Sequence, residues 1–394
     1  MLKTSTLEEE LLLLCARAHL DDAASDRVRS LLHQELDWNH LVTLAKQHFV
    51  VNRLYVHLYE MAFERVPQRV IDELRIIADN NLRMSLRLIG ELRRLIRLFE
   101  DHDLPLISLR GPVFAQQIYR NIGLRTSGDL DLLIRKQDFT RVRNLLCSSG
   151  YEPLIRCRNG VQEKIHLKCS IEYQFVSVAL DDVVIDLHWD VALMPHLRAP
   201  VAPDLMKNAS VISLLGENVR TLSTEDLLFI ACMHAANHFW ESLDVISDVA
   251  EIVRGFPSLN WDRLNENVEK TRSHRAFLVS LLLVSDLFDA PVPKEVLDTA
   301  KQDRHARKLA DHIEGKLFKE PMRRSKFRRA YDDLITKESL RDRARVLLFF
   351  AFVPTAKDYG MLPLLEAMTA LYHVIRPLRL AAEFVTLQCT ALGR

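Results

Sequence analysis

The stretch Leu124–Ile134, LRTSGDLDLLI, places two aspartates two positions apart inside a run of aliphatic residues. Successive side chains of a β-strand point to opposite faces, so Asp129 and Asp131 share one face, about 7 Å apart. Leu130 and Leu132 then share the other face and enter the core. Two carboxylates at this spacing repel each other, and a purely structural strand would gain nothing from them. The pattern therefore predicts a buried strand whose polar face holds a positive group.

A second apolar run, VVIDLHW at residues 183–189, carries a third acid, Asp186. If the two strands are neighbours in one sheet, Asp186 can join Asp129 and Asp131. Two acids on one strand and one on the next form the protein half of a two-metal phosphoryl-transfer site. Mg²⁺ or Mn²⁺ is the expected ion, because hard cations take oxygen ligands and often bind together with substrate phosphates.

The residues upstream, SLRGPVFAQQIYR at 108–120, have the pattern of a strand, a turn at Arg110 and Gly111, and a helix that begins near Pro112. A glycine at such a turn lets the backbone approach a phosphate, and a helix N-terminus favours negative charge. The paired acids follow about 18 residues later, which makes the combination more specific than either part. Arg110 or Arg125 is the alternative to a metal ion as the positive group between the acids.

The fold class follows from apolar spacing and from glycine content. Only 11 of 394 residues are glycine, and long stretches space apolar residues by three and four positions, so most of the chain is expected to be helical. The longest helix is expected from Pro67 to Asp103. Short β-rich runs gather in the middle of the chain. The expected fold is α+β and mostly helical, with a small mixed-sheet core at 104–195 embedded between an N-terminal helical region, 1–103, and a C-terminal helical region, 196–394.

Charge and cysteine content restrict the class of partner. The 53 basic residues equal the 53 acidic ones, so no overall field favours nucleic acid, and a polynucleotide substrate is not expected. The six cysteines are scattered without a C-x-x-C pair, as in reduced proteins, and the N-terminus lacks the pattern of a signal peptide. A cytoplasmic location is therefore expected.

The longest apolar run is VLLFFAFVP, from Val346 to Pro354. It has about half the length that a membrane-spanning helix needs, so no transmembrane segment is expected. We expect a buried helix here, with peripheral membrane contact as the alternative.

The run LRGPVFAQQIYRNIGLRTSGDLDLLIRKQDFTRVRNLLCSSGY, residues 109–151, resembles the uncharacterised nucleotidyltransferase family of the polymerase-beta-like superfamily. The positions that carry the resemblance are Leu109, Arg110, Gly111, Tyr119, Arg125, Asp129, Asp131, Leu132, Leu133, Gly150 and Tyr151. Arg110 stands where lysine is common in the family, which keeps the charge but changes its geometry. The later IDLHW adds Asp186, His188 and Trp189, and TEDLLFIACMHAANHFWESLDVISDVAEIV adds His234, His238, Trp240 and Asp248.

The resemblance implies transfer of a nucleoside monophosphate from a nucleoside triphosphate such as ATP to a hydroxyl-bearing acceptor, with release of pyrophosphate and dependence on Mg²⁺ or Mn²⁺. The expected catalytic residues and metal ligands are Asp129, Asp131 and Asp186. Expected nucleotide-binding residues are Arg110, Gly111, Arg125, Ser127 and Gly128, and expected substrate-contacting or supporting residues are Tyr119, His188, His234, His238 and Trp240. The acceptor, whether a small molecule, sugar, peptide or protein, and the oligomeric state stay open.

His234 and His238 stand four positions apart on a predicted helix, a spacing that can bind zinc. Ala235 occupies the place of the glutamate in H-E-x-x-H, so we expect these histidines to pack against the catalytic core or to line a substrate pocket. Asp248, on the same segment, is expected to hydrogen-bond a helix to the sheet.

Two other functions fit part of this pattern. A glycosyltransferase also uses D-x-D after an apolar strand to hold manganese and a nucleotide sugar, but the glycine turn before the acids and the third strand acid argue against it. A nucleotide-binding regulatory protein could keep the fold without the chemistry. Retention of all three acids argues against that function.

Overall fold

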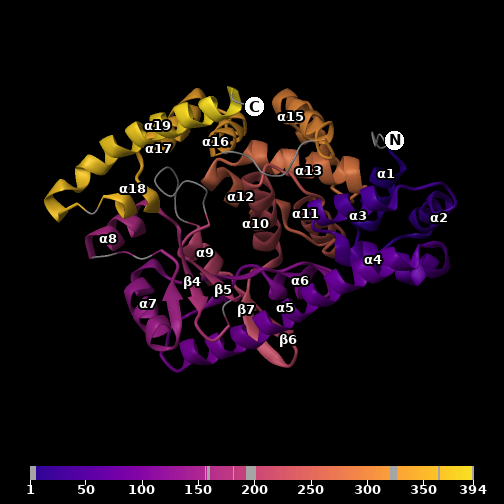
Figure 1. The fold of residues 1–394 in the computed structure, drawn as a ribbon, viewed down its shortest axis with the longest axis horizontal. Coiled ribbons are helices and arrows are strands. Elements are labelled where there is room, and N and C mark those ends of the chain that lie inside the picture. The colour runs from indigo at the N-terminus through magenta and orange to yellow at the C-terminus, as the bar shows by residue number, and fades with distance from the viewer. Residues whose placement is uncertain are drawn as a thin grey trace.

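Figure 1 shows the computed structural model, in which helices surround a single mixed sheet. The structure describes residues 6–155, 157, 160–180, 182–191, 201–319, 326–362 and 364–392. Helices predominate, and the strands lie in the middle part of the sequence, so the expected mostly helical α+β class is confirmed. The division into three regions at residues 103 and 195 stays a prediction.

The N-terminal helices begin where polar side chains satisfy free backbone amides. They are α1 (Leu7–Cys15), α2 (Asp22–Leu31), α3 (Trp38–Gln47), α4 (Val51–Ala62), the short 3₁₀ helix η1 (Phe63–Arg65) and α5 (Gln68–Glu100). Thr6, Asp21 and Asp37 each accept a backbone N–H at the start of α1, α2 and α3. α5 follows Pro67 and continues for 33 residues, as the apolar spacing predicts.

The sheet contains strands from three parts of the sequence. Its strands are β1 (Ile107–Ser108), β2 (Asp129–Leu133), β3 (Tyr151–Pro153), β4 (Glu172–Ser177), β5 (Val184–His188), β6 (Ser210–Leu214) and β7 (Glu217–Thr221). They lie in the order β3-β4-β5-β2-β1-β7-β6. β2 runs parallel to β5, and β1 runs parallel to β7, while the other neighbours are antiparallel. The intervening helices are α6 (Pro112–Tyr119), η2 (Lys136–Asp138), α7 (Phe139–Ser148), α8 (Gly160–Cys169) and α9 (Ala202–Lys207).

The β6–β7 hairpin corrects the expectation that residues 196–394 are helical throughout. Its two-residue turn consists of Leu215 and Gly216, which both have positive φ, 47° and 85°. Hairpin turns of this kind usually carry Asn-Gly or Asp-Gly, so a leucine in the first position left only a weak turn signal in the sequence. Because β7 pairs with β1, the sheet extends beyond residue 195.

Different helices cover the two faces of the sheet. On one face, Leu88, Leu92 and Leu95 of α5 share a core cluster with Leu130 and Leu132 of β2. On the other face, Leu133 joins a larger cluster with helices α10 (Thr224–Asn237) and α11 (Leu243–Gly255). The paired acids of β2 therefore face the layer that contains α10 and α11.

The described residues after α11 are mainly helical and lie largely along the side opposite α5 (Figure 1). These elements are α12 (Trp261–Thr271), α13 (His274–Phe288), α14 (Lys294–Gln302), α15 (Arg304–Glu314), α16 (Lys326–Ile335), α17 (Leu340–Phe352), α18 (Ala356–Met361), η3 (Glu366–Leu371) and α19 (Tyr372–Leu392). The fully buried Asp358 connects α18 to α19, because it accepts hydrogen bonds from Arg376 (3.2 Å) and Arg379 (2.6 Å). Burial acts to raise the pKa of this carboxyl, but the hydrogen bonds from Arg379 and Thr355 outweigh it and lower the pKa to about 2.

A buried polar network joins α4, α6 and α11 to the loop that leads into β2. Arg53, with no exposed surface, donates to the hydroxyl of Tyr119 and to Ser247, both at 2.6 Å. The Tyr119 hydroxyl in turn donates to Asp248 (2.7 Å), and the Arg125 guanidinium forms an ion pair with Asp248 (3.0 Å). Asp248 thus connects α11 to the loop before β2, in keeping with its expected helix-to-sheet role.

Replacing Asp248 by asparagine is expected to lower the free energy of unfolding by about 3–5 kcal/mol, because Arg125 would keep a buried charge without its counterion. Tyr119→Phe removes one hydrogen bond and is expected to cost about 1–2 kcal/mol. Urea unfolding measures both changes, with the exposed pair Arg87–Asp182 as control: Asp182→Asn should change the unfolding free energy by less than about 1 kcal/mol. Equal, small effects for Asp248→Asn and Asp182→Asn would contradict the structural importance of the network.

Acidification should weaken the attachment of α19. Because the folded pKa of Asp358 is about 2, below the usual value for aspartate, its contribution to stability is complete at neutral pH. The contribution is lost as the pH falls from about 5 to about 2. In calorimetry, the difference in Tm between the wild type and Asp358→Asn should shrink over this interval. A Tm difference that does not change with pH would show that the ionised Asp358 carboxylate does not stabilise the attachment of α19.

Candidate active site

The alternation predicted for β2 is present. Leu130 and Leu132 have no exposed surface, whereas Asp129 and Asp131 are partly buried and point to the opposite face. β5 shows the same alternation, with Ile185 and Leu187 buried. Both strands therefore present their polar side chains on one face, since their apolar side chains contribute to one core cluster on the other.

The pairing of β2 with β5 decides which polar side chains meet. The strands are parallel, and Asp131 lies directly opposite Asp186, with Leu133 opposite His188. Neighbouring strands are about 4.8 Å apart, so side chains at paired positions on one face are side by side. The hypothesis that the strand of Asp186 is a neighbour of the paired acids is thus confirmed.

Three side chains at this pairing form a group that could hold a metal ion. Asp131, Asp186 and His188 each offer one ligand atom, and these atoms lie within 4.8 Å of one another. His188 Nε2 is 2.9 Å from a carboxylate oxygen of Asp131, and Gln174 donates a hydrogen bond to Asp186 at 3.0 Å. Two carboxylates and an imidazole fit a divalent cation. Asp129 lies on the same face of β2 but is not a member of this group, so its role as a ligand stays a prediction.

Burial and mutual repulsion shift the ionisation of these groups. Burial, then the charges of Asp131 and Asp129, raise the pKa of Asp186 to about 7. Burial and the charge of Asp131 also raise the pKa of Asp129. Burial acts the same way on Asp131, but the hydrogen bond with His188 outweighs it and lowers the pKa of Asp131. The cluster thus gathers carboxylates in a buried place, where a cation would stabilise their charged forms.

The glycine turn lies against the start of β2. Gly111 has φ of 77°, in the left-handed region, and a Cβ atom there would be 2.9 Å from the backbone oxygen of Asp129. Only glycine fits this close approach. α6 begins at Pro112, immediately after the turn, as the sequence predicted, and the close approach of Gly111 to Asp129 places the N-terminus of α6 next to the strand that carries the acids.

Arg110 is held by a neutral histidine. Its Nη1 lies 2.5 Å from Nδ1 of His234 on α10. A guanidinium can only donate hydrogen bonds, so Nδ1 must accept and the imidazole must be neutral. Burial and, next in size, the charge of Arg110 lower the pKa of His234 well below its usual value, which agrees with a neutral imidazole. Nδ1 of His234 is therefore engaged with Arg110, which argues against the zinc site considered for His234 and His238.

Two buried polar atoms near the turn have no hydrogen-bond partner among the described residues, Nε of Arg110 and Oγ of Ser127. Buried polar atoms in folded proteins nearly always have a partner. Both atoms can donate a hydrogen bond, and a phosphate has the acceptor oxygens that would satisfy them.

The structure assigns several other predicted residues to packing or to exposed positions. Arg125 and Tyr119 belong to the buried Asp248 network, and the indole of Trp240, fully buried, donates to Ser280 at 2.9 Å. Gly128, just before Asp129, is exposed. His238 follows the end of α10, with its side chain 48% exposed and its ring centroid 4.4 Å from that of His234. The predicted nucleotide-binding roles of Arg125 and Gly128 stay predictions.

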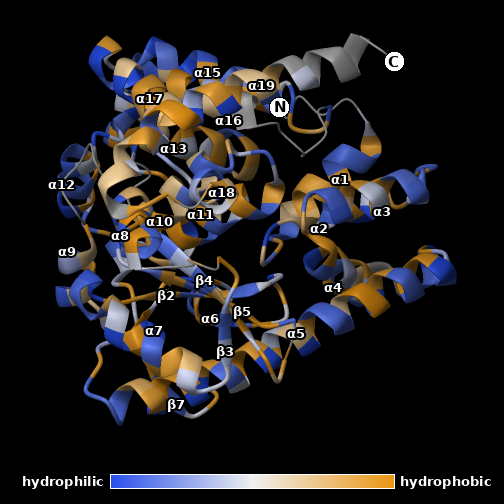
Figure 2. Cartoon of the chain, turned by 60° about the vertical axis from the view of Figure 1, so that its left-hand side comes forward, coloured by the Kyte–Doolittle hydropathy of each residue, from blue (hydrophilic) through white to orange (hydrophobic). Residues whose placement is uncertain are grey.

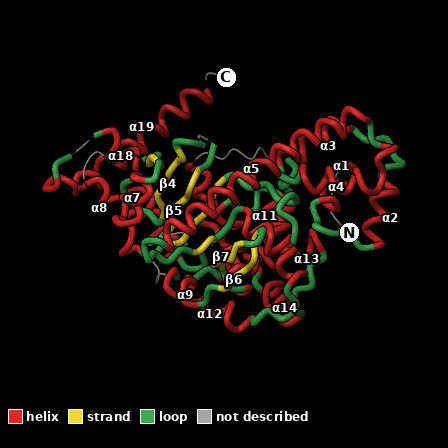
Figure 3. The backbone as a smooth tube through the Cα atoms, turned by 90° about the horizontal axis from the view of Figure 1, so that it is seen from below, coloured by secondary structure: helices red, strands yellow, loops and turns green. Residues whose placement is uncertain are grey.

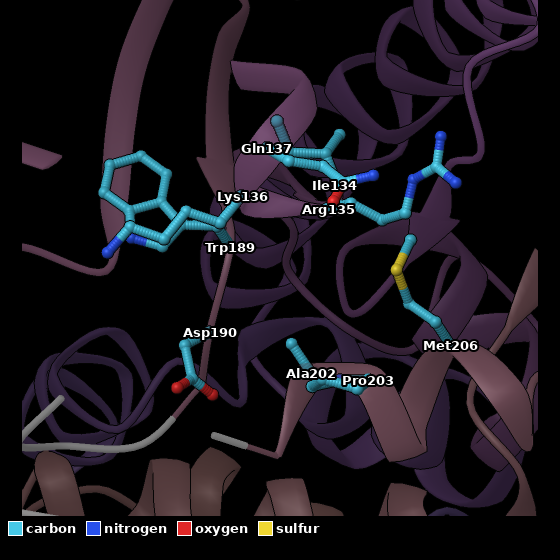
Figure 4. A pocket seen from close by; sticks show the side chains of 9 residues that line it. All are labelled: Ile134, Arg135, Lys136, Gln137, Trp189, Asp190, Ala202, Pro203 and Met206. Carbon is cyan, nitrogen blue, oxygen red and sulfur yellow. The ribbon is translucent and has the colours of Figure 1, made fainter. Parts of the chain in front are cut away.

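A cavity of about 840 Å³ lies where β2 and β5 end (Figure 4). Its walls include the apolar side chains of Ile134, Trp189 and Met206 and the charged side chains of Arg135, Lys136 and Asp190. Sequence reasoning missed this cavity, although a signal existed. Its charged residues directly follow two predicted strands, and ligands of open α/β sheets bind beyond the carboxyl ends of parallel strands.

Comparison with known proteins agrees with this geometry. A family model described as an uncharacterised nucleotidyltransferase matches residues 34–289, which is more than half of the chain. The match covers the glycine turn, both acidic strands and the helix that carries His234. A comparison with curated proteins gives no match. The chain therefore belongs to the uncharacterised nucleotidyltransferase family.

Proposed function

We propose that this protein transfers a nucleoside monophosphate from a nucleoside triphosphate to a hydroxyl-bearing acceptor, with release of pyrophosphate. The observation that carries the proposal is the direct pairing of Asp131 with Asp186, with His188 completing a group of ligand atoms within 4.8 Å. Family membership supports the reaction class.

Each residue of the site has a proposed task. Asp131, Asp186 and His188 would hold Mg²⁺ or Mn²⁺, and Asp129 would extend the ligand set toward a second ion. Divalent cations bound here would neutralise the charge of the phosphates and make the acceptor hydroxyl more acidic. The unpartnered donors of Arg110 and Ser127 would bind phosphate oxygens.

Gly111 and the start of α6 would let the triphosphate approach the backbone next to β2. Asp186, held in its charged form by a bound cation, would also assist removal of the acceptor proton. The geometry thus provides positioning and charge compensation, on which phosphoryl transfer mainly depends.

We also propose that the cavity beyond β2 and β5 binds the acceptor. Arg135 follows Asp131 by four positions, about 13 Å along an extended chain, so an acceptor in the cavity can reach toward the metal group. Its volume of about 840 Å³ is in the range of small-molecule sites. The indole of Trp189 and the cation of Lys136 favour an acceptor with an apolar part and an anionic group, whereas Arg135 already forms an ion pair with Asp138 at 2.5 Å. A small molecule, or the side chain of a peptide, fits these walls better than a polynucleotide.

Asp131→Asn and Asp186→Asn are each expected to lower the rate of transfer by about 10³-fold, because the site loses a ligand and its charge. The assay incubates purified protein with each labelled nucleoside triphosphate, Mg²⁺ or Mn²⁺ and a cell extract, and follows pyrophosphate and labelled product. The matched control is Asp26→Asn, an exposed aspartate on α2 that forms an ion pair with Arg29 and should keep full activity.

Other outcomes distinguish the competing functions. Turnover of nucleotide sugars alone would establish a glycosyltransferase. Triphosphate binding without turnover of any triphosphate would establish a regulatory protein. Absence of triphosphate binding by calorimetry, with metal ion present, would refute the proposal.

The histidine in the ligand group should bias the choice of ion. Imidazole binds transition metals more readily than it binds Mg²⁺, so the protein is expected to bind Mn²⁺ more tightly than Mg²⁺. His188→Asn should weaken Mn²⁺ binding by about tenfold or more and should affect Mg²⁺ less. Calorimetry with each ion alone and the electron paramagnetic resonance of bound Mn²⁺ measure this, with His238→Asn as control. Unchanged Mn²⁺ affinity in His188→Asn would place His188 outside the ligand set.

A further inference from the structure

The C-terminal helices expose an unusual amount of apolar surface. More than half of the large hydrophobic side chains that are exposed in the described part of the chain lie between Leu340 and Phe384. We define the apolar C-terminal surface by Leu347, Leu348 and Phe352 of α17, Leu365 of the following connection, and Val374 and Leu378 of α19. Single exposed leucines are ordinary, but such a concentration marks an interaction site.

This surface corrects the expectation that Val346–Pro354 forms a buried helix. Val346 is buried, but Leu347, Leu348 and Phe352 are 51%, 58% and 45% exposed. α17 packs against α16 and α19, and these neighbours bury only one side of the helix. Leu348 and Phe352 are four residues apart and Leu347 adjoins Leu348, so the three side chains lie on one side of the helix.

α19 repeats the pattern. Val374 and Leu378 are 57% and 66% exposed at an interval of four residues, and Leu371, the last residue of η3, is 44% exposed three residues before Val374. Each helix is therefore buried by its neighbours on one side and exposes apolar side chains on another side. Figure 1 places α17, α18 and α19 at the edge of the molecule, Figure 3 places α18 and α19 there as well, and Figure 2 shows apolar colour along α17.

The exposed charged side chains among the described residues of this region are cations. Arg341 and Lys357 are exposed, whereas the acids Asp342, Asp358 and Glu383 are at least half-buried and each forms an ion pair with an arginine. Among the described side chains between residues 340 and 384, no carboxylate is exposed. The surface thus combines apolar side chains with cations.

We propose that the apolar C-terminal surface docks on an anionic lipid membrane, with α17 and α19 lying in the interfacial plane. Surfaces of this kind combine leucine and phenylalanine with lysine and arginine, whereas the cores of protein interfaces are enriched in aromatic residues, methionine and arginine and are depleted of lysine. Leucine dominates here, and the local tyrosines, Tyr359 and Tyr372, are buried. A second copy of the chain would bring Arg341 and Lys357 against the same two cations, and the described side chains of this region include no exposed carboxylate to meet them.

The attachment is peripheral. In the described part of the chain, no helix combines the length and the apolar character needed to cross a membrane. The docking surface and the acidic strands involve different elements, because the acids lie on β2 and β5. The inference therefore does not depend on the proposed function.

The test uses the full chain in sedimentation with vesicles of phosphatidylcholine alone or mixed equally with phosphatidylglycerol. The wild type should bind the anionic vesicles and bind phosphatidylcholine much less. The double variant Leu347→Gln and Leu378→Gln should lower the partition coefficient by about tenfold or more. Both leucines are exposed, so the thermal unfolding of this variant should match that of the wild type.

The matched control replaces Val211 and Leu215 by glutamine, since these are 60% and 61% exposed on the β6–β7 hairpin, and it should bind as the wild type does. Arg341→Glu with Lys357→Glu should abolish the preference for anionic lipid. Failure of the wild type to bind anionic vesicles would overturn the proposal. An equal loss of vesicle binding in the Val211 and Leu215 control would also overturn it. So would a wild-type protein that forms a dimer and binds no vesicles, if the Leu347 and Leu378 variant dissociates that dimer.

Discussion

The parallel pairing of β2 with β5 is the constraint on which the site depends. It sets Asp131 opposite Asp186, and it places Leu132 opposite Leu187 in the core below. The side-chain period of a strand is two, so a slip of one residue would carry Asp186 into the core and a leucine onto the polar face. Hydrophobic burial therefore holds the acids in register, although the acids repel each other.

Burying several carboxylates close together costs electrostatic free energy. Basic side chains from the surrounding elements offset part of this cost. The hydrogen bond with His188 keeps the pKa of Asp131 low even though burial acts to raise it. Arg110 stands at the glycine turn, where neutral His234 accepts its hydrogen bond without adding a second charge. Arg125 also brings positive charge near the acids, but Asp248 binds its guanidinium. The helical layer of α10 and α11 thus fixes the geometry of the cations.

Several features could be predicted because they depend on local pattern. The alternation of Asp129 and Asp131 with buried leucines, the helix after Pro67 and the turn at Gly111 all follow from neighbouring residues. The features that were missed depend on distant contacts or on weak signals. The β6–β7 hairpin has a leucine in its turn, and the exposure of α17 depends on how few elements pack against it.

The sequence by itself determined the chemistry that this protein can offer. Three local patterns carry this information: two acids on one strand face, a third acid in another apolar strand, and a glycine turn. They can be recognised in the sequence because side chains alternate between the two faces of a strand. Only the tertiary structure decided which side chains meet. The strand register brought His188 into the ligand group with Asp131 and Asp186, while the helical layer engaged Arg125 with Asp248 and Arg110 with His234. These side chains pair with residues that are far away in the sequence. Which residues meet depends on how the whole chain packs, because burial couples every element to its neighbours, and no local sequence pattern specifies it.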